Sequence, residues 1–243
     1  MLKPIEWIGG SKKSLDGMPS EIKKFFGWAL LDVQYGDTPD GAKLFGEGLP
    51  HEIWKIAEDH DGNTYRAAYM VKFPEIVYVL DVFMKKSKSG IKTPQADKNR
   101  VLERFKAAKR HYDENHLKRH NQVMERKTKR KTYVNGIEIE HGSGNVFEDL
   151  GFPDAAERLA KAELARLVRN IIREKSWTQA HAAGVLGIAA SDMSDLVRGK
   201  LDRFSQERIA RFLNSLDMDV RIQVAPRRAG KKRADITVEW VGA

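Results

Sequence analysis

The hydrophobic positions of the first half of the chain alternate with polar ones in the manner of β-strands. Three such runs follow one another: HEIWKIAED, TYRAAYMVKF and IVYVLDVFMKK. Their connections, HDGN and PE, are short, so an antiparallel meander is expected. KPIEWI predicts a first strand. Apolar residues at helical spacing predict a helix between Pro19 and Gly36, and Thr93-Pro94 opens a second one.

In the second half the apolar period becomes helical. A long helix is predicted from about Pro153 to Glu174, and shorter helices over 178–186, 191–198 and 205–216. The runs DVRIQVAP and ADITVEWV predict two strands that end the chain. The fold class is therefore α+β: an antiparallel sheet with helices, linked to an all-α domain with a short C-terminal β segment.

The charge is concentrated between these halves. Residues 84–132 contain 17 Lys and Arg against 5 Asp and Glu, while the whole chain of 243 residues has a net charge of +9. Such a concentrated field indicates a nucleic acid or an acidic partner, although a solvated helix followed by a basic linker is the alternative. We predict domains at 1–116 and 142–243, with residues 117–141 as the basic linker.

The composition of the chain excludes several kinds of chemistry. There is no cysteine, which excludes disulfides, thiol nucleophiles and Cys-ligated zinc. No leader or membrane-spanning run is visible, so a cytoplasmic protein without membrane contact is expected. His111, His116 and His120 share no helical face and are interpreted as solvated. No metal site and no cofactor are predicted.

The stretch WTQAHAAGVLGIAASDMSDLVRGK has the layout of a helix-turn-helix. Thr178 is suited to cap the first helix, Gly187 to make the turn, and Ser191 to cap the second helix. In such a unit the second helix enters the major groove. The candidate DNA-binding residues are Thr178, Gln179, Ser191, Asp192, Ser194, Arg198 and Lys200.

This stretch resembles the Cro/repressor-like (XRE) helix-turn-helix proteins. With the flanking runs SGNVFEDLGFPDAAERL and FSQERIARFLNSLDMDVRI, it is similar to HigA-type antitoxins over about Gly142 to Val224. That family often carries Gln and Arg near the start of the recognition helix, where this chain has Ala190 and Asp192. An exposed Asp192 would repel phosphate and accept only from cytosine. A helical bundle that contacts only protein is the alternative.

The first half resembles the RelE superfamily of ribonuclease toxins, specifically the HigB-type (phage Gp49-like) branch, over about Leu2 to Asn115. The resemblance rests on Tyr65-Arg66, the apolar strand after it, and KKSKSGIKTP before the last helix. It implies a toxin that binds the translating ribosome and cleaves messenger RNA. The genetic partner of a HigB-type toxin is a HigA-type antitoxin, so each resemblance supports the other.

RNA cleavage requires proton transfer and stabilisation of a dianionic transition state, which suits neighbouring cations. The candidate catalytic residues are Arg66, Lys86 and Lys55. Because Lys85 and Lys86 alternate along their strand, only one of them shares the face of Arg66, and the resemblance favours Lys86. Lys85, Lys88 and Lys92 are expected to hold RNA. Solvated strand-end lysines are the alternative, and Asp81 would either weaken activity as an acid among the cations or pair with Arg66 or Lys55.

One continuous chain thus contains a toxin-like and an antitoxin-like half, with Met124 inside the basic segment as a possible start for the second. We expect a fused toxin–antitoxin protein with mRNA on the ribosome and operator DNA as partners, intramolecular or intersubunit contact between the halves, and a homodimer. The alternative is a DNA-binding regulator whose RelE-like half is an inert interaction domain.

Overall fold

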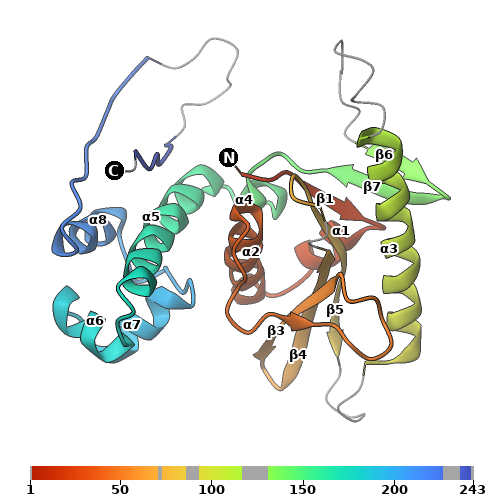
Figure 1. The fold of residues 1–243 in the computed structure, drawn as a ribbon, viewed down its shortest axis with the longest axis horizontal. Helices are drawn as coiled ribbons and strands as arrows, with labels where there is room; N and C mark the ends of the chain where they lie inside the picture. The colour runs from red at the N-terminus through yellow and green to blue at the C-terminus, as the bar shows by residue number, and fades with distance from the viewer. Residues whose placement is uncertain (1, 71–72, 86–92, 117–130, 227–235, 242–243) are drawn as a thin grey trace. The chain divides into compact units, whose positions relative to one another are not determined.

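The computed structural model describes residues 2–70, 73–85, 93–116, 131–226 and 236–241. By its internal contacts the chain divides into two compact units, residues 1–150 and residues 151–243 (Figure 1). The first contains a mixed sheet with helices and the second is helical, which confirms the predicted α+β fold class.

A seven-stranded sheet with the order β2-β3-β4-β5-β1-β7-β6 forms the centre of the first unit. The predicted meander is confirmed, because β3, β4 and β5 pair antiparallel with neighbouring registers. Asp61 and Gly62 make the first turn with φ of 49° and 72°, which twists the backbone as a two-residue hairpin requires. β1 pairs parallel with β5, so the sheet is mixed where an antiparallel one was predicted. The strands are β1 Ile5–Ile8, β2 Lys43–Leu44, β3 Ile53–His60, β4 Asn63–Met70, β5 Val77–Lys85, β6 Lys131–Val134 and β7 Ile137–His141.

The last two strands correct the predicted linker. Residues 117–130 lie outside the described residues, but β6 and β7 form a hairpin, and β7 pairs antiparallel with β1. Sequence spacing gave no sign of this pairing, because β1 lies far away in the chain. The short helix α4 (Val146–Asp149) follows, and it also belongs to the first unit.

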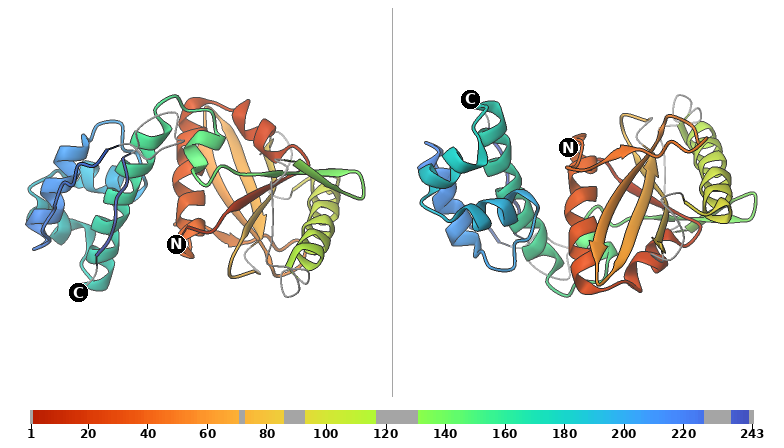
Figure 2. Two further views of the ribbon diagram at one scale, coloured as in Figure 1. Left: turned by 90° about the horizontal axis from the view of Figure 1, so that it is seen from above. Right: turned by 90° about the horizontal axis from the view of Figure 1, so that it is seen from below.

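Helices cover both faces of the sheet. α2 (Ser20–Tyr35) lies on one face and α3 (Gln95–His116) on the other (Figure 2). Gly36 ends α2 in a left-handed conformation, as its place after the last apolar residue predicted. The short helix α1 (Ser11–Asp16), which the sequence pattern did not reveal, packs on β5, and Ser11 Oγ donates to the carbonyl of Val79 at 2.9 Å.

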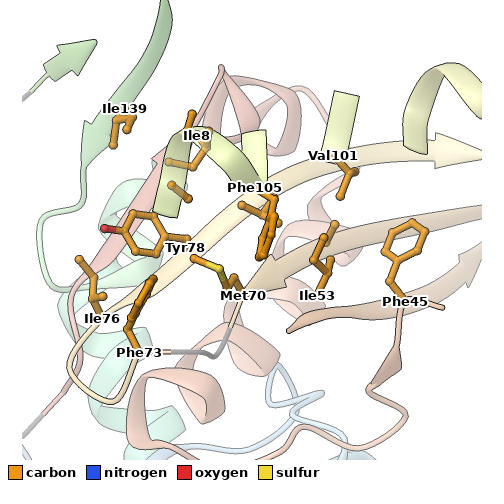
Figure 3. Packing of buried hydrophobic residues seen from close by; sticks show 14 of the residues in the cluster. Ile8, Phe45, Ile53, Met70, Phe73, Ile76, Tyr78, Val101, Phe105 and Ile139 are labelled. Atoms are coloured by element: carbon orange, nitrogen blue, oxygen red, sulfur yellow. The ribbon is translucent and has the colours of Figure 1, made fainter. Parts of the chain in front are cut away.

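The core beneath α3 contains Val101 and Phe105 from the helix and residues from six strands and their flanking loops, among them Phe45, Ile53, Tyr78 and Ile139 (Figure 3). A bulge in β5 shapes this core. The partner of Ala68 is Asp81 and that of Tyr69 is Val79, so Leu80 is the extra residue. Tyr78 and Asp81 would otherwise face opposite sides of the sheet, yet both bond to side chains of α3.

Four helices make up the described core of the second unit: α5 Ala155–Glu174, α6 Gln179–Leu186, α7 Ala190–Val197 and α8 Gln206–Ser215. All four agree with the predicted positions to within two residues at each end. α7 begins one residue earlier than expected, so its N-cap is Ala189, and Ser191 is not the cap.

The predicted C-terminal β segment differs from the structure. Residues 219–226 and 236–241 have no regular secondary structure, and Ile222 and Val224 are each 90% exposed. An alternating pattern alone does not make a β-strand, because the backbone N–H and C=O groups also need a neighbouring strand as their hydrogen-bond partner. Within the described residues neither segment has one.

Candidate functional site

Two of the cations predicted for the first unit, Arg66 and Lys55, lie on one face of the sheet. Arg66 is directly opposite Phe83, and Lys55 is opposite Ala68, two residues along β4 from Arg66. Side chains of paired residues, and of residues two apart, share a face of a sheet. Phe83 packs in the core beneath α3, which identifies the face. Arg66 and Lys55 therefore both project on the α3 side.

Thr93 and Glu47 join the two cations. Arg66 Nη1 donates to Thr93 Oγ1 at 2.6 Å, and Thr93 Oγ1 donates to Glu47 Oε1 at 3.1 Å. The backbone N–H of Thr93 donates to Glu47 Oε2 at 2.9 Å. Lys55 Nζ lies 3.4 Å from Glu47 Oε1 and donates to the carbonyl of Phe45 at 3.0 Å. We call these four residues, Lys55, Glu47, Thr93 and Arg66, the cation cluster.

Glu47 is held in an uncommon backbone conformation. Its φ is 57°, between Gly46 at 65° and Gly48 at 85°. A left-handed conformation costs a residue with a Cβ about 1–2 kcal/mol, so surrounding contacts must hold it there. Partial burial alone would raise the pKa of Glu47, but hydrogen bonds from Thr93 and the charge of Lys55 outweigh this and lower it. The carboxylate is therefore ionised at neutral pH.

The guanidinium group of Arg66 is only partly hydrogen-bonded among the described residues. Its Nε is shielded from solvent and has no hydrogen-bond partner among the described residues, while Nη1 is bound to Thr93. A buried guanidinium N–H without an acceptor is costly, and an anionic oxygen is the partner that it fits best. Sequence reasoning missed Glu47 and Thr93. The glycines around Glu47 were the available signal, because they mark a loop with a special backbone.

Lys85 belongs to the same face as Arg66. It pairs with Thr64, two residues from Arg66 along β4, and its side chain is largely buried. The register thus places Lys85 on the face where Lys86 was expected. Lys86, Lys88 and Lys92 lie outside the described residues, so their roles stay predictions.

Asp81 does not pair with Arg66 or Lys55 as expected. It is 1% exposed and bonds to two arginines of α3: Arg104 Nη1 at 2.5 Å from Oδ1 and Arg100 Nε at 2.7 Å from Oδ2. Burial raises the pKa of Asp81, and the charges of Arg104 and Arg100 oppose that rise. Asp81 lies on the same face of the sheet as the cation cluster, but two arginines of α3 occupy both of its carboxylate oxygens, which is the reason for the difference.

His111 is also unlike its prediction. It is buried at 9% exposure, and its Nδ1 lies 2.9 Å from the hydroxyl of Tyr78. It is therefore a core residue whose hydrogen bond connects α3 with β5. His120 lies outside the described residues.

In the second unit, the turn between α6 and α7 is built as the sequence predicted. Thr178 Oγ1 accepts from the backbone N–H of His181 at 3.2 Å and caps α6. Gly187 has φ of 64°, a conformation that glycine adopts without strain. Ala182, Met193 and Leu196 are buried where the two helices meet.

Asp192 is buried, whereas the sequence placed it facing bases. Its Oδ1 lies 2.7 Å from Arg203 Nη2 and its Oδ2 lies 2.9 Å from Arg208 Nη2, so both oxygens are bound within the protein. The cause is non-local, because α8 and the loop before it supply both arginines. Two guanidinium groups therefore balance the negative charge of Asp192, which the sequence had placed opposite DNA. Of the other candidates, Thr178, Gln179, Ser191, Arg198 and Lys200 are exposed and Ser194 is partly buried.

Two regions of the chain match known protein families. Residues 13–106 match the phage-derived Gp49-like family, and residues 146–225 match a helix-turn-helix domain family. The chain joins a Gp49-like domain to a helix-turn-helix domain. The first match confirms the resemblance to Gp49-like domains of the RelE/HigB toxin type, and the second confirms the resemblance to XRE helix-turn-helix proteins.

A solved structure titled as a putative XRE family transcriptional regulator is 40% identical over 35% of this chain and 97% of its own, with a TM-score of 0.34. No curated protein matches the chain. Among the described residues, no helix combines the length and apolar character needed to cross a membrane.

Proposed function

We propose that the chain is a fused toxin–antitoxin protein, in which the Gp49-like domain cleaves messenger RNA on the ribosome and the helix-turn-helix domain restrains it and binds operator DNA. The observation that carries the proposal is the shared face of Arg66, Lys55 and Lys85. Three cations from three adjacent strands belong to that face, and a shielded guanidinium N–H of Arg66 has no bound acceptor among the described residues.

The chemistry follows from these groups. The 2′-hydroxyl of RNA gives its proton to water and attacks the adjacent phosphate, the bond from phosphorus to the 5′-oxygen breaks, and charge builds on the phosphate oxygens in the transition state. The fork of Arg66 suits two of these oxygens, and the ammonium groups of Lys55 and Lys85 add electrostatic stabilisation and can supply a proton to the leaving oxygen. No metal is required by this scheme.

Glu47 and Thr93 act in this proposal as positioning residues. Thr93 fixes Nη1 of Arg66, and Glu47 fixes both Thr93 and the ammonium of Lys55. The left-handed backbone at Glu47 pre-organises the carboxylate before substrate arrives. A shift of about 1 Å in catalytic groups can lower a rate roughly 100-fold, so the Glu47→Gln variant should lose activity while it still folds.

For the second domain, the supported reading is DNA binding by α7 in the major groove, as a two-fold dimer. Exposed Arg198 and Lys200 lie at and just beyond the end of α7, where they would meet backbone phosphate, and Ser191 lies in its first turn. Base readout by short side chains such as Ser191 predicts modest sequence discrimination.

The test compares growth and bulk translation in cells that express residues 1–150 or the full chain. Arrest is expected from residues 1–150 alone, and either Arg66→Ala or Lys55→Ala should relieve it. Lys106→Ala removes an exposed cation from α3 and is the matched control, which should still arrest growth. A folded 1–150 fragment that neither arrests growth nor cleaves RNA would contradict the proposed nuclease.

The second candidate is a DNA-binding regulator with an inert Gp49-like domain. It is favoured by the fact that the cation cluster is already partly neutralised, since Glu47 is bound to Lys55 and, through Thr93, to Arg66. Tight, salt-sensitive binding to palindromic DNA, without RNA cleavage by either form of the chain, would establish this function.

A further inference from the structure

The segment between the two family matches carries a further inference. The Gp49-like match ends at residue 106 and the helix-turn-helix match begins at residue 146. α4 (Val146–Asp149) lies inside the second match, yet by its contacts it belongs to the first unit, which ends at Leu150. A piece of the helix-turn-helix half is thus built into the fold of the Gp49-like half.

We propose that residues 131–150, the β6–β7 hairpin and α4, form a docking arm by which the helix-turn-helix half holds the Gp49-like half. The proposal rests on the proposed function, because it treats the two halves as binding partners in one chain. Its surface on the Gp49-like half is the edge of β1 together with one side of α2. The occupant is this chain's own segment.

Strand addition is the first part of the interaction. β7 pairs antiparallel with β1 over three residues, from Glu6↔His141 to Ile8↔Ile139. The pairing is extended at both ends, because Gly9 N–H donates to the carbonyl of Glu138 at 2.7 Å and Gly142 N–H to that of Ile5 at 2.9 Å. Without the arm, β1 would present an unpaired backbone edge, which is a template for another strand.

Polar side-chain contacts fix the register of this pairing. Lys12 Nζ lies 2.6 Å from Glu140 Oε1, and His141 Nδ1 lies 2.5 Å from Glu6 Oε1. A shift of the arm by one residue would separate both contacts and turn Ile139 out of the core. The pairing is therefore specific for this segment.

Apolar side chains anchor both parts of the arm. Ile139 is 1% exposed and belongs to the same buried cluster as Ile8 and Tyr78 (Figure 3). Val146 in α4 and Leu150 at its C-cap are fully buried, and Phe147 is nearly so. α4 approaches α2 so closely that a Cβ on Gly27 would lie 2.8 Å from Phe147 Cε1. Only glycine at that position admits the arm.

A buried polar bond connects the two parts. Asp149 accepts from the indole N–H of Trp7 in β1 at 3.0 Å and from the backbone N–H of Ser143 at 2.8 Å. Trp7 is 1% exposed, so its N–H would be left without a partner if the arm departed. The arm thus pairs with the β1 edge, fills the apolar core and binds the Trp7 N–H of the Gp49-like half. These residues precede or begin the helix-turn-helix match.

The experiment uses the full chain with a protease site inserted between residues 117 and 130. After cleavage, the two pieces are expected to elute together in equal amounts during size-exclusion chromatography. In a second version the site is placed between Leu150 and Gly151, beyond the arm, and the piece from 151 onward should then elute separately. Separation after the first cut, or continued association after the second, would overturn the docking arm.

Side-chain variants keep the test independent of where the chain is cut. In the first version, Phe147→Asp places a charge in the buried contact and should weaken the association by on the order of 100-fold. Tyr133→Asp lies on the same hairpin at 65% exposure and should leave the pieces together. Equal behaviour of the two variants would refute the proposal. Absence of RNA cleavage would refute only the proposed nuclease, because co-elution requires no activity.

Discussion

Asp81→Asn is expected to destabilise the first unit by about 3 kcal/mol, because it breaks a buried ionic network. The Asp81 side chain is 2% exposed, and it faces Arg104 at 13% and Arg100 at 39% exposure. Asparagine keeps one oxygen as an acceptor but presents its NH₂ group to an arginine N–H, so two donors meet. Removal of one partner from a buried pair costs roughly 3–5 kcal/mol. The lower end applies here, since Arg100 can turn toward water.

The assay is urea unfolding of residues 1–150, followed by tryptophan fluorescence. A loss of about 3 kcal/mol lowers the urea midpoint by roughly 1–2 M at ordinary m-values. Asp97→Asn is the matched control, because Asp97 also binds Arg100, at 2.8 Å, but only as an i,i+3 pair on the helix surface. It should cost about 0.5 kcal/mol or less. Equal destabilisation by the two variants would show that burial does not set the strength of the network.

Three further perturbations follow from single contacts. Gly142→Ala should destabilise the first unit by about 1–3 kcal/mol in urea unfolding, because the new Cβ would lie 2.6 Å from Asp149 Oδ2. Tyr69→Phe should make the chain less sensitive to alkali: burial, and the charge of Asp32, raise the pKa of Tyr69, so above about pH 10 only the unfolded phenol releases its proton. The contribution of Tyr69 to the free energy of unfolding is therefore fully present below pH 10. Above pH 10 it falls by about 1.4 kcal/mol per pH unit. Asp192→Asn should steepen the salt dependence of DNA binding, measured by fluorescence anisotropy, because it frees two arginine charges.

Each of these expectations has a contrary result. Gly184→Ala meets no atom within 4 Å and should stabilise α6 by about 1 kcal/mol, so a similar loss at Gly142 and Gly184 would refute the steric argument. An unchanged alkaline unfolding curve would show that Tyr69 ionises normally. A salt slope unchanged by Asp192→Asn would mean that Arg203 and Arg208 do not reach DNA.

Much of the local structure was readable from neighbouring residues. The meander followed from alternation and a short Asp-Gly turn, and the helix-turn-helix followed from the Thr178 cap and Gly187. These signals are readable because the groups that satisfy one another lie within a few residues. The same is true of the basic region, whose charge needs no fold to be counted.

Tertiary structure decided what those elements contact. The bulge at Leu80 lets both Tyr78 and Asp81 face α3, and the register places Lys85 on the face of Arg66. Glu47 enters the cation cluster only because its loop meets Thr93.

Two segments outside the meander differ from their predictions, and the physical reason is the same for both. The hairpin at 131–141 found β1 as a partner, whereas residues 219–226 have none among the described residues. Asp192, expected at the surface, is buried by arginines from α8 and the loop before it. The sequence by itself determined β1, the β3–β4–β5 meander, α2, α3 and the four helices of the second unit, but not α1, β2, α4 or the β6–β7 hairpin. The pairing of strands, charges and buried polar groups depended on residues distant in the chain, and only the folded protein brings those together.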